Sequence, residues 1–524
     1  MSAASKNDTL AAEVLAVLRG AGVRTIVVCP GGRNAPLVLA CHASREAFDV
    51  LTFFEERSAA FFALGRIRRD SAPVAVITTS GTAAAELLPA MLEAVHAGLP
   101  LIAVTADRPR ALRGTGAPQT IDQLPLFAAA RVPVIDLDTP GRLTALPAGA
   151  VHLNICFDEP LGGGEPVALS PAPAGTPAAA PLCMTESGAR AQWDDFFARV
   201  RNPLVLVSTL APDDAQAVAP WLASLSSPLY LEEISQLRGQ RNLQEFSLHS
   251  GERILSSPEC RAACDGVLRI GGIPTPRIWR ELDADPRPVL HVSRTTFPGL
   301  ARTAPVIPLE LFRTLNGTVP AGRASAELFA RDRAIAEETA KLLLQEPQSE
   351  AALVRAAADN FADNARVLLG NSLAIREWDL VAPRAVTGRT YFANRGVNGI
   401  DGLVSTALGL SCADRPAAAL IGDLSALYDL AGLWPAAQSG GADITVAVVN
   451  NGGGKIFGRM FGNASFLNAH SLRFRGWAEM FGWRYGQVHS AGDPWPADSP
   501  RVVEILPCAQ ATARFAESYS ALWH

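Results

Sequence analysis

The sequence predicts an α/β protein with three doubly wound parallel-sheet domains. Short apolar runs, typical of strands buried on both faces, alternate with helical segments along most of the chain. The 524 residues exceed what one core holds and suit about three domains of roughly 150 residues each. The segment Gly162–Pro181 is rich in proline, alanine and glycine, the composition of an extended linker. We therefore expect domains at residues 1–182, which include this linker, 183–345 and 346–524.

Composition and charge exclude several classes of protein. Hydrophobic residues make up 48% and charged residues 19%, as in a globular protein with large cores. The net charge of −5 gives no reason to expect binding to nucleic acid or to an anionic membrane. The N-terminus lacks the pattern of a secretory signal, and no apolar run is long enough to span a bilayer. The eight cysteines are scattered without a CxxC pair, which predicts reduced thiols in the cytoplasm.

In the first region, apolar runs are expected to form strands, and the loops after them to carry function. The expected strands are Thr25–Cys29, Val50–Phe54, Val74–Thr79, Leu101–Thr105, Val132–Ile135 and Val151–Phe157. The expected helices are Thr9–Arg19, Pro36–His42, Ala59–Arg68 and Ala83–His96. The loops contain Arg33, Glu56, Ser80 and Arg108. Ser80 is expected to cap the next helix, and at this point the helix dipole is the favoured explanation of Glu55 and Glu56.

The middle region repeats the alternation. Its expected strands are Pro203–Ser208, Leu229–Glu232, Gly266–Ile270 and Val289–Val292. The glycine turn Gly271–Arg277 is not a GxGxxG motif, so a dinucleotide site is not expected there. A long helical pattern, Arg323–Leu344, leads to the third region.

The third region contains a candidate metal site. Ala418–Ile421 and Ile444–Val449 are expected to be parallel strands, joined by a helix at Leu427–Gln438. Asp423 follows the first strand, and Asn450 and Asn451 follow the second, so these side chains converge at one sheet edge. Carboxylate and amide oxygens are ligands that suit Mg²⁺ together with a substrate's phosphates. An ordinary βαβ unit with turn asparagines is the alternative. Further strands are expected at Arg366–Leu369, Thr390–Ala393 and Arg501–Leu506.

Several motifs, taken in order, carry a family resemblance. The first and third regions contain CPGGRNAPL, FFEERSAAFFALG, TTSGTAAAELLPA, TADRP, GAPQTIDQ, VHLNICFDEPL, NRGVNGIDGL and GDLSALYDL; the middle contributes only LRGQRN and VLRIGGIPTPR. Together they resemble the 2-succinyl-5-enolpyruvyl-6-hydroxy-3-cyclohexene-1-carboxylate synthase family, which belongs to the thiamine diphosphate-dependent enzymes and acts in menaquinone biosynthesis. The resemblance implies three domains of the thiamine diphosphate enzyme type, with the pyrimidine bound by the first and the diphosphate by the third.

The resemblance also implies the cofactor contacts. Glu56, the glutamate directly before arginine, would bond the pyrimidine N1′ and act as the catalytic acid–base group. Ile400 would support the bent cofactor, and the other implied contacts are Ser80, Gly422, Asp423, Leu424, Ser425, Asn451, Ile456 and Phe457.

The implied metal is Mg²⁺, with Mn²⁺ as a substitute. Its ligands would be Asp423, the Asn451 side chain and the Gly453 carbonyl. The motif is one residue longer than expected, so the choice between Asn450 and Asn451 stays open.

The implied transferase reaction decarboxylates 2-oxoglutarate on thiamine diphosphate and adds the succinyl carbanion equivalent to isochorismate. Both substrates are dicarboxylates, which arginine binds through paired hydrogen bonds. By resemblance, Ser372, Arg376 and Arg395 would hold 2-oxoglutarate, and Arg33, Arg108, Gln119 and Arg277 would hold isochorismate. The active sites would lie between subunits of a homodimer or homotetramer.

Four departures from the family pattern put the second substrate in doubt. Gly32 replaces Ser, Pro118 replaces Asn, Asn398 replaces Ser and Arg277 replaces Lys. Another thiamine diphosphate-dependent decarboxylase or carboligase with a different acceptor, and a non-catalytic ligand-binding relative, are therefore kept as alternatives. Loss of Glu56 or Asp423 would favour the non-catalytic relative, and both residues are present. Whether the middle domain binds a regulator stays open.

Overall fold

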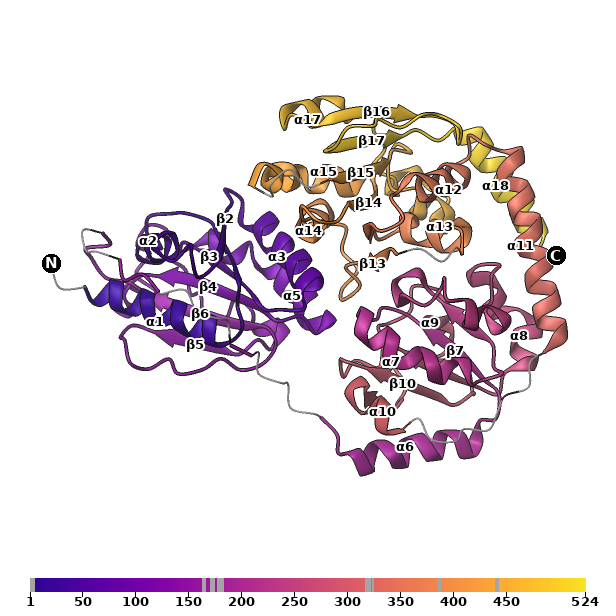
Figure 1. Ribbon diagram of the computed structural model, residues 1–524, viewed down its shortest axis with the longest axis horizontal. Helices are drawn as coiled ribbons and strands as arrows, with labels where there is room; N and C mark the ends of the chain where they lie inside the picture. The colour runs from indigo at the N-terminus through magenta and orange to yellow at the C-terminus, as the bar shows by residue number, and fades with distance from the viewer. Residues whose placement is uncertain are drawn as a thin grey trace. The chain divides into compact units, whose positions relative to one another are not determined.

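The computed structural model contains three parallel β-sheets with helices around them (Figure 1). It describes residues 5–162, 166–169, 175–176, 183–315, 322, 325–384, 388–438 and 443–524. The predicted α/β fold with three parallel sheets is confirmed. Most of the predicted linker Gly162–Pro181 lies outside the described residues. By its internal contacts the chain divides into two compact units; the first comprises Met1–Pro181, Gly396–Ala413 and Tyr428–Gly441, and the second comprises the remainder.

The first unit contains a six-stranded sheet in the order β2-β1-β3-β4-β6-β5. Its strands are β1 (Thr25–Val28), β2 (Asp49–Thr52), β3 (Val74–Thr78), β4 (Leu101–Asp107), β5 (Val134–Leu137) and β6 (Val151–Cys156). Its helices are α1 (Lys6–Gly20), α2 (Ala35–Ala43), α3 (Glu56–Asp70), α4 (Thr82–Ala85) and α5 (Leu88–Ala97), with short 3₁₀ turns η1 (Arg110–Leu112) and η2 (Ala128–Ala130). The single helix expected at Ala83–His96 is wrong, because the chain restarts at Leu88 with a proline in the first turn.

Two later segments belong to the first unit: helix α14 (Leu403–Leu410) and the 3₁₀ segment η7 (Leu430–Gln438). Helices α3 and α14 approach closely because glycines face each other. A Cβ at Gly65 would lie 2.1 Å from the Thr406 carbonyl oxygen, and one at Gly409 would lie 2.2 Å from that of Phe62. Only glycine permits this backbone contact.

The second unit contains the five-stranded sheet β11-β10-β9-β7-β8. Its strands are β7 (Pro203–Val207), β8 (Leu229–Leu231), β9 (Gly266–Ile270), β10 (Val289–Ser293) and β11 (Val306–Pro308). Its helical segments are α6 (Glu186–Arg199), α7 (Pro212–Ala223), η3 (Glu233–Ser235), η4 (Arg241–Phe246), η5 (Glu252–Ser256), α8 (Pro258–Ala263), α9 (Ile278–Glu281), η6 (Leu309–Leu311), α10 (Phe312–Leu315) and α11 (Ala326–Gln345).

The second unit also contains the six-stranded sheet β13-β12-β14-β15-β17-β16. Its strands are β12 (Arg366–Leu369), β13 (Thr390–Phe392), β14 (Ala417–Gly422), β15 (Ile444–Val449), β16 (Arg484–Val488) and β17 (Arg501–Ile505). Its helical segments are α12 (Glu350–Asn360), α13 (Leu373–Val381), α15 (Asp423–Tyr428), α16 (Lys455–Phe461), η8 (Ala464–Phe466), α17 (Arg475–Met480) and α18 (Ala509–Ala521). The helix expected at Leu427–Gln438 is wrong: α15 begins at Asp423 itself, and a 3₁₀ segment covers Leu430–Gln438.

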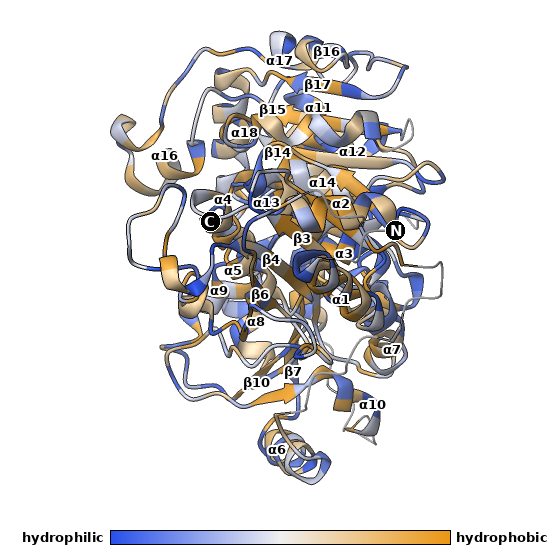
Figure 2. Cartoon of the chain, turned by 90° about the vertical axis from the view of Figure 1, so that its left-hand side faces the viewer, coloured by the Kyte–Doolittle hydropathy of each residue, from blue (hydrophilic) through white to orange (hydrophobic). Residues whose placement is uncertain are grey.

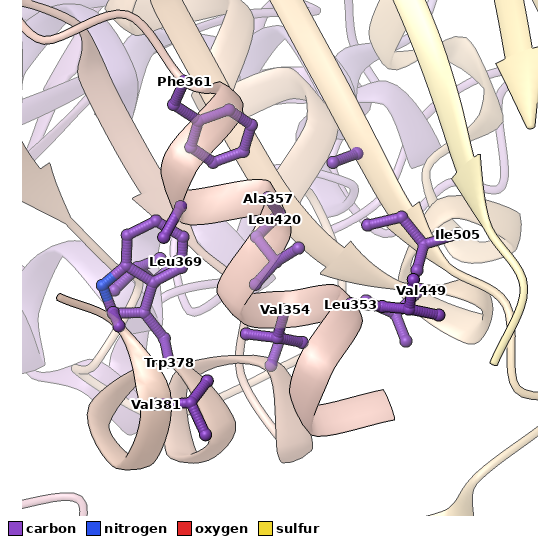
Figure 3. Close-up of a cluster of buried hydrophobic side chains, with 14 of the residues drawn as sticks. Leu353, Val354, Ala357, Phe361, Leu369, Trp378, Val381, Leu420, Val449 and Ile505 are labelled. Atoms are coloured by element: carbon purple, nitrogen blue, oxygen red, sulfur yellow. The ribbon is translucent and has the colours of Figure 1, made fainter. Parts of the chain in front are cut away.

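Packing in the second unit joins its two sheets. Apolar side chains from α12, α13 and the strands form one core, in which Phe361 stacks on the buried Trp378 (Figure 3). Arg238, in the LRGQRN motif, is 2% exposed and pairs with Glu233 (3.4 Å) and Asp379 (3.2 Å). Since Asp379 lies on α13, this motif has a structural role.

Figure 2 shows β14 and β15 in the colours of hydrophobic residues, as expected for strands covered on both faces. In the part of the chain that the structure describes, we find no helix with both the length and the hydropathy to cross a membrane.

Candidate cofactor and substrate sites

The paired glutamates at the start of α3 have different roles. Glu55 is the N-cap residue, and its carboxylate accepts hydrogen bonds from the backbone N–H groups of Arg57 (3.1 Å) and Ser58 (2.9 Å). Glu56 is the first helical residue, and burial followed by the charge of Glu55 raises the pKa of its carboxyl group. Its charge also helps burial to raise the pKa of Cys29, directly after β1. The structure therefore assigns capping to Glu55 and leaves Glu56 beside the carboxyl end of the sheet as a candidate proton-sharing group.

A buried carboxylate that the sequence analysis missed, Asp429, reinforces this end of α3. Its Oδ1 accepts hydrogen bonds from Ser58 Oγ (3.2 Å) and Ser405 Oγ (2.8 Å), and its Oδ2 accepts one from the Ser405 backbone (2.7 Å). The Ser58 hydroxyl also donates to Glu55. Burial raises the pKa of Asp429 to about 6. Its only sequence signal is its place in the motif GDLSALYDL.

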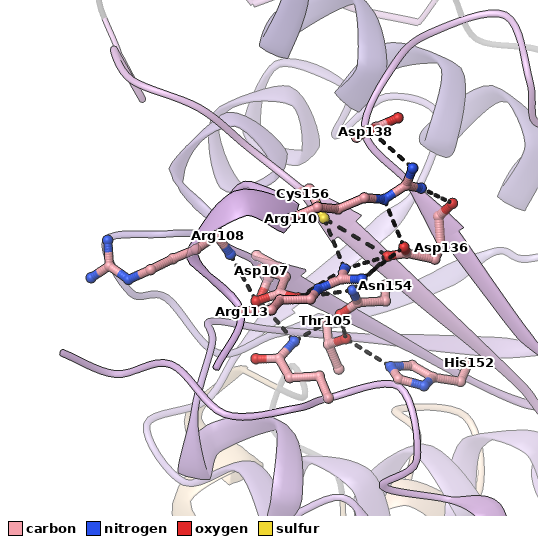
Figure 4. A network of polar contacts seen from close by, with 12 residues as sticks. Thr105, Asp107, Arg108, Arg110, Arg113, Asp136, Asp138, His152, Asn154 and Cys156 are labelled. Carbon is pink, nitrogen blue, oxygen red and sulfur yellow. Dashed lines mark hydrogen bonds and ion pairs between the residues drawn. The ribbon is translucent and has the colours of Figure 1, made fainter. Parts of the chain in front are cut away.

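An ion-pair network spans the carboxyl ends of β4, β5 and β6 (Figure 4). Arg113 pairs with the fully buried Asp107 (3.2 Å) and with Asp136 (2.7 Å), and Asn154 donates to both carboxylates (3.0 and 2.9 Å). The hydrogen bond from Arg113 and that from Asn154 lower the pKa of Asp136 against the opposing effect of burial. Arg108 lies next to this network, and Figure 4 shows its side chain pointing away from it. The network thus fixes the loop that carries Arg108.

The predicted isochorismate residues of this unit lie in loops joined by hydrogen bonds. Arg108 donates to the Pro118 carbonyl from Nε (3.0 Å) and Nη2 (2.8 Å), and Ser80 Oγ donates to the Gln119 carbonyl (2.8 Å). Ser80 does not cap the next helix as expected; the N-cap of α4 is Gly81. Arg33 is buried and pairs with Glu159 (3.2 Å).

In the second unit, Asp423 organises the glycine loop after β15. Its Oδ2 accepts hydrogen bonds from the backbone N–H groups of Gly452 (2.9 Å) and Gly453 (2.8 Å), and His470 Nε2 lies 3.3 Å away. Gly453 has φ 131°, and a Cβ there would lie 2.4 Å from the Leu467 carbonyl oxygen. Only glycine allows this loop to fold over Asp423. The predicted metal residues Asp423 and Gly453 are therefore brought together.

Asn450 and Asn451 are both held by carboxylates. Asn450 Nδ2 donates to Glu504 (2.6 Å) and to the Leu472 carbonyl (2.9 Å). Asn451 Nδ2 donates to both carboxylate oxygens of Glu350 (3.1 and 3.0 Å). Within the described residues the Oδ1 atom of each asparagine is buried without a hydrogen-bond partner. Two amide oxygens are thus available to a ligand.

A cavity of about 440 Å³ opens beside these asparagines. Its polar lining includes Asn450, Asn451, His470, Arg473 and His489. Because these residues follow the ends of β15 and β16 or lie between those strands, the cavity is at the carboxyl edge of the sheet, where open α/β sheets bind ligands.

The predicted 2-oxoglutarate residues lie in or next to the strained turn between β12 and α13: Ser372 is in the turn, Arg376 is on α13, and Arg395 follows β13. Ser372 has φ 70° and ψ −124°, a backbone conformation that side-chain-bearing residues rarely adopt. Arg376 donates to the Ser372 carbonyl (2.6 Å) and to the Thr275 carbonyl (3.4 Å). Arg395 donates to Asn371 Oδ1 (3.0 Å), the neighbour of Ser372. Strain of this kind persists where surrounding structure enforces it, which is common at functional sites.

Arg277 occupies a different environment from these residues. It is exposed before α9, and its backbone N–H donates to Glu252 (3.1 Å). A buried acid nearby, Glu232, accepts from the Thr275 backbone (2.7 Å), and burial raises its pKa to about 7. Glu232 lies in none of the sequence motifs, so the sequence offers no signal that would identify it.

The remaining predicted cofactor residues are distributed between the two units. Gly422 ends β14, while Leu424 and Ser425 lie in the first turn of α15. Ile456 and Phe457 lie in the first turn of α16. Ile400 is half-buried ahead of α14, in the first unit.

The donors around Asp423 fit a hard divalent cation bound to phosphate. No cluster of three or more His, Cys, Asp or Glu side chains suited to a metal occurs among the described residues. A metal here would therefore use one carboxylate, an orphaned amide oxygen and a loop carbonyl, and would complete its shell with phosphate oxygens and water, as Mg²⁺ does. On the first unit, Glu56 is a carboxyl group with a raised pKa that fits a pyrimidine nitrogen.

The chain is similar to known enzymes over nearly its whole length. Residues 8–126 match the family described as "Thiamine pyrophosphate enzyme, N-terminal TPP binding domain". The 2-succinyl-5-enolpyruvyl-6-hydroxy-3-cyclohexene-1-carboxylate synthase of Bdellovibrio bacteriovorus is 38% identical, with 99% of each chain covered. The enzymes of the same name from Akkermansia muciniphila and Chloroflexus aurantiacus are 36% and 35% identical, covering 94% and 83% of this chain and 94% and 80% of theirs.

The fold has a solved counterpart. A structure from Mycobacterium smegmatis, described as a thiamin diphosphate-dependent enzyme, superposes with a TM-score of 0.68 over 96% of this chain and 99% of its own. At 17% sequence identity this likeness concerns the fold alone.

Proposed function

Because this chain belongs to the 2-succinyl-5-enolpyruvyl-6-hydroxy-3-cyclohexene-1-carboxylate synthase family of thiamine diphosphate-dependent enzymes, we propose that it decarboxylates 2-oxoglutarate and joins the remaining succinyl group to isochorismate in menaquinone biosynthesis. The observation that carries the proposal is the 38% identity to the Bdellovibrio bacteriovorus synthase across 99% of both chains. The residues with the required chemistry, Glu56 and Asp423, are both present.

Thiamine diphosphate, when bound, supplies the nucleophilic carbon and the electron sink for decarboxylation. The chain's own groups would bind and tune it. Glu56 would share a proton with the pyrimidine, a role that its raised carboxyl pKa favours. Asp423, the Asn451 amide oxygen and the Gly453 carbonyl would hold Mg²⁺, or Mn²⁺ in its place, against the diphosphate.

The substrate carboxylates would be bound by two groups of residues. Ser372, Arg376 and Arg395 are assigned to 2-oxoglutarate, and the strained backbone at Ser372 supports this assignment. Arg33, Arg108, Gln119 and Arg277 are assigned to isochorismate. Arg108 and Gln119 lie in one braced loop, which supports a shared role for these two.

The functional unit that we propose is a homodimer or a pair of homodimers. Two residues before Glu56, Phe54 is 60% exposed and packs edge-to-face on Trp434, which is 42% exposed. An exposed aromatic pair beside a site supports cover by a second copy of the chain. We also propose that the enzyme acts in the cytoplasm; all eight cysteines lie in the described residues, and none forms a disulfide.

The test is an assay with purified protein, Mg²⁺, thiamine diphosphate, 2-oxoglutarate and isochorismate. We expect isochorismate to disappear in step with CO₂ release. Turnover of 2-oxoglutarate with another acceptor but not isochorismate would instead identify a different carboligase. A protein that binds the cofactor but releases no CO₂ under any of these conditions would be the non-catalytic relative.

A further inference from the structure

The side chain that holds Asn451 determines which of its amide atoms faces outward. Asn451 Nδ2 donates to both carboxylate oxygens of Glu350, at 3.1 and 3.0 Å. A carboxylate accepts hydrogen bonds and donates none, so the amide can face Glu350 only with its nitrogen. The amide oxygen is thereby turned away from Glu350, and it is buried with no hydrogen-bond partner among the described residues. An orphaned acceptor of this kind is suited to a cation.

Glu350 is itself fixed in position. It is 3% exposed and is the first residue of α12, whose N-cap Ser349 accepts from the Ala352 backbone (3.2 Å). The Glu350 backbone N–H donates to Thr512 on α18 (3.0 Å). A buried carboxylate with a fixed backbone can impose one orientation on its partner.

The neighbouring asparagine is directed elsewhere. Asn450 Nδ2 donates to Glu504, which lies on β17. In the sheet order β14-β15-β17, this strand is on the side of β15 opposite to β14 and its following residue Asp423. The Asn450 side chain is therefore tied to the half of the sheet away from Asp423, although it too has a carboxylate partner. The Asn451–Glu350 pair can therefore be tested against the Asn450–Glu504 pair, since each joins an asparagine amide to a glutamate carboxylate.

We propose that Glu350 is a positioning residue of the metal site: its carboxylate orients the Asn451 amide so that Asn451, and not Asn450, presents its oxygen to Mg²⁺. The inference deepens the proposed function and rests on it, because it takes the Asp423 loop to be the site of the metal and the diphosphate. Of the two asparagines, Asn451 is then the metal ligand, because its partner Glu350 directs its amide oxygen toward the metal.

The test measures Mg²⁺ binding without turnover. The Mg²⁺ dependence of thiamine diphosphate binding is followed by calorimetry for the full-length wild type, E350Q and the matched control E504Q. A glutamine offers a donor as well as an acceptor, so the Asn451 amide loses its enforced orientation. We expect E350Q to raise the half-saturating Mg²⁺ concentration about tenfold or more, and E504Q to change it by less than about twofold. An unchanged E350Q, or an equal loss in E504Q, would overturn the proposal.

Exchanging the amide and the carboxylate between positions 350 and 451 tests whether Glu350 positions Asn451 or only supports the fold. In N451D two carboxylates face each other, and we expect weak Mg²⁺-dependent binding. In the double variant E350Q/N451D the glutamine donates to the new aspartate, which again presents an oxygen, and we expect most of the affinity to return. If the double variant binds no better than N451D, Glu350 acts on the fold and not on the metal ligand.

Two controls keep the outcomes distinct. The circular dichroism spectrum and the thermal midpoint of each variant without cofactor report whether it folds. If E350Q misfolds, the comparison of N451D with E350Q/N451D tests the role of Glu350 instead. Wild-type protein that shows no Mg²⁺-dependent binding of thiamine diphosphate would contradict the proposed function itself. Normal wild-type binding with an unaffected E350Q would contradict only the role of Glu350.

Discussion

The six-stranded sheets of the two units share one strand order and carry different chemistry at their carboxyl ends. The orders β2-β1-β3-β4-β6-β5 and β13-β12-β14-β15-β17-β16 are the same pattern. At the first sheet the loops hold arginines and acids, including Glu56, Arg108 and Arg113. At the second, the turns after β14 and β15 hold one acid, Asp423, with amides and glycines, and the turn after β13 adds Arg395. The first edge suits isochorismate and a pyrimidine, and the second suits a metal with phosphate beside the residues assigned to 2-oxoglutarate.

The shared topology sets where each site lies, and the residues of the loops set what the site binds. In both sheets the strand order reverses between two neighbouring strands, β1 and β3 in one and β12 and β14 in the other. Such a reversal leaves a crevice at the carboxyl ends of the strands. In the second sheet Ser372 lies in the turn that follows β12, and Asp423 comes directly after β14.

The largest expected effect separates the two glutamates of the first sheet. We expect E56Q to lower kcat at least 100-fold, because the amide cannot exchange the proton, while thiamine diphosphate affinity stays within about threefold. The matched variant E55A removes the N-cap and should cost about 1 kcal/mol of stability with a much smaller loss of rate. Steady-state kinetics and urea unfolding measure the two effects. Equal rate losses in both variants would contradict the separation of roles.

A smaller effect is expected from the network behind Arg108. Replacing Arg113 with methionine leaves Asp107 and Asp136 without their shared cation and loosens the loop. We expect the KM for isochorismate to rise about tenfold, equivalent to about 1.4 kcal/mol, while the KM for 2-oxoglutarate changes by less than about twofold. The control R110M removes a more exposed partner of Asp136 and should change little. A rise in both KM values would show that the network supports the whole fold.

The smallest effect concerns the strained turn of the second sheet. We expect S372G to stabilise the protein by about 1 kcal/mol, because glycine adopts φ 70° without strain, and to raise the KM for 2-oxoglutarate a few-fold by removing the hydroxyl. The control S257G lies at φ −67° in a capping position and should lose stability. Urea unfolding and initial rates check both. A destabilised S372G would show that the turn is not strained.

The separate roles of two adjacent, identical residues could not be predicted from the sequence. Glu55 and Glu56 are adjacent and identical, and so are Asn450 and Asn451. Their roles depend on partners that lie elsewhere in the chain: Ser58, which joins Glu55, also bonds Asp429, 371 positions away, and Asn451 bonds Glu350, 101 positions away. Among the supporting carboxylates, Asp429 lies in a motif that does not reveal its role, and Glu350 and Glu232 lie in no motif, because burial and pairing depend on how distant elements pack.

The α/β class, the three parallel sheets and the sheet edges that carry the candidate residues can all be predicted from the amino-acid sequence. This is possible because buried parallel strands require continuous apolar runs and because the loops after such strands meet at one edge. Three features became visible only in the folded chain: α15 begins at Asp423, Ser80 bonds Gln119 instead of capping a helix, and Ser372 is strained. These features depend on packing and on hydrogen bonds between segments far apart in the chain, which local patterns do not encode.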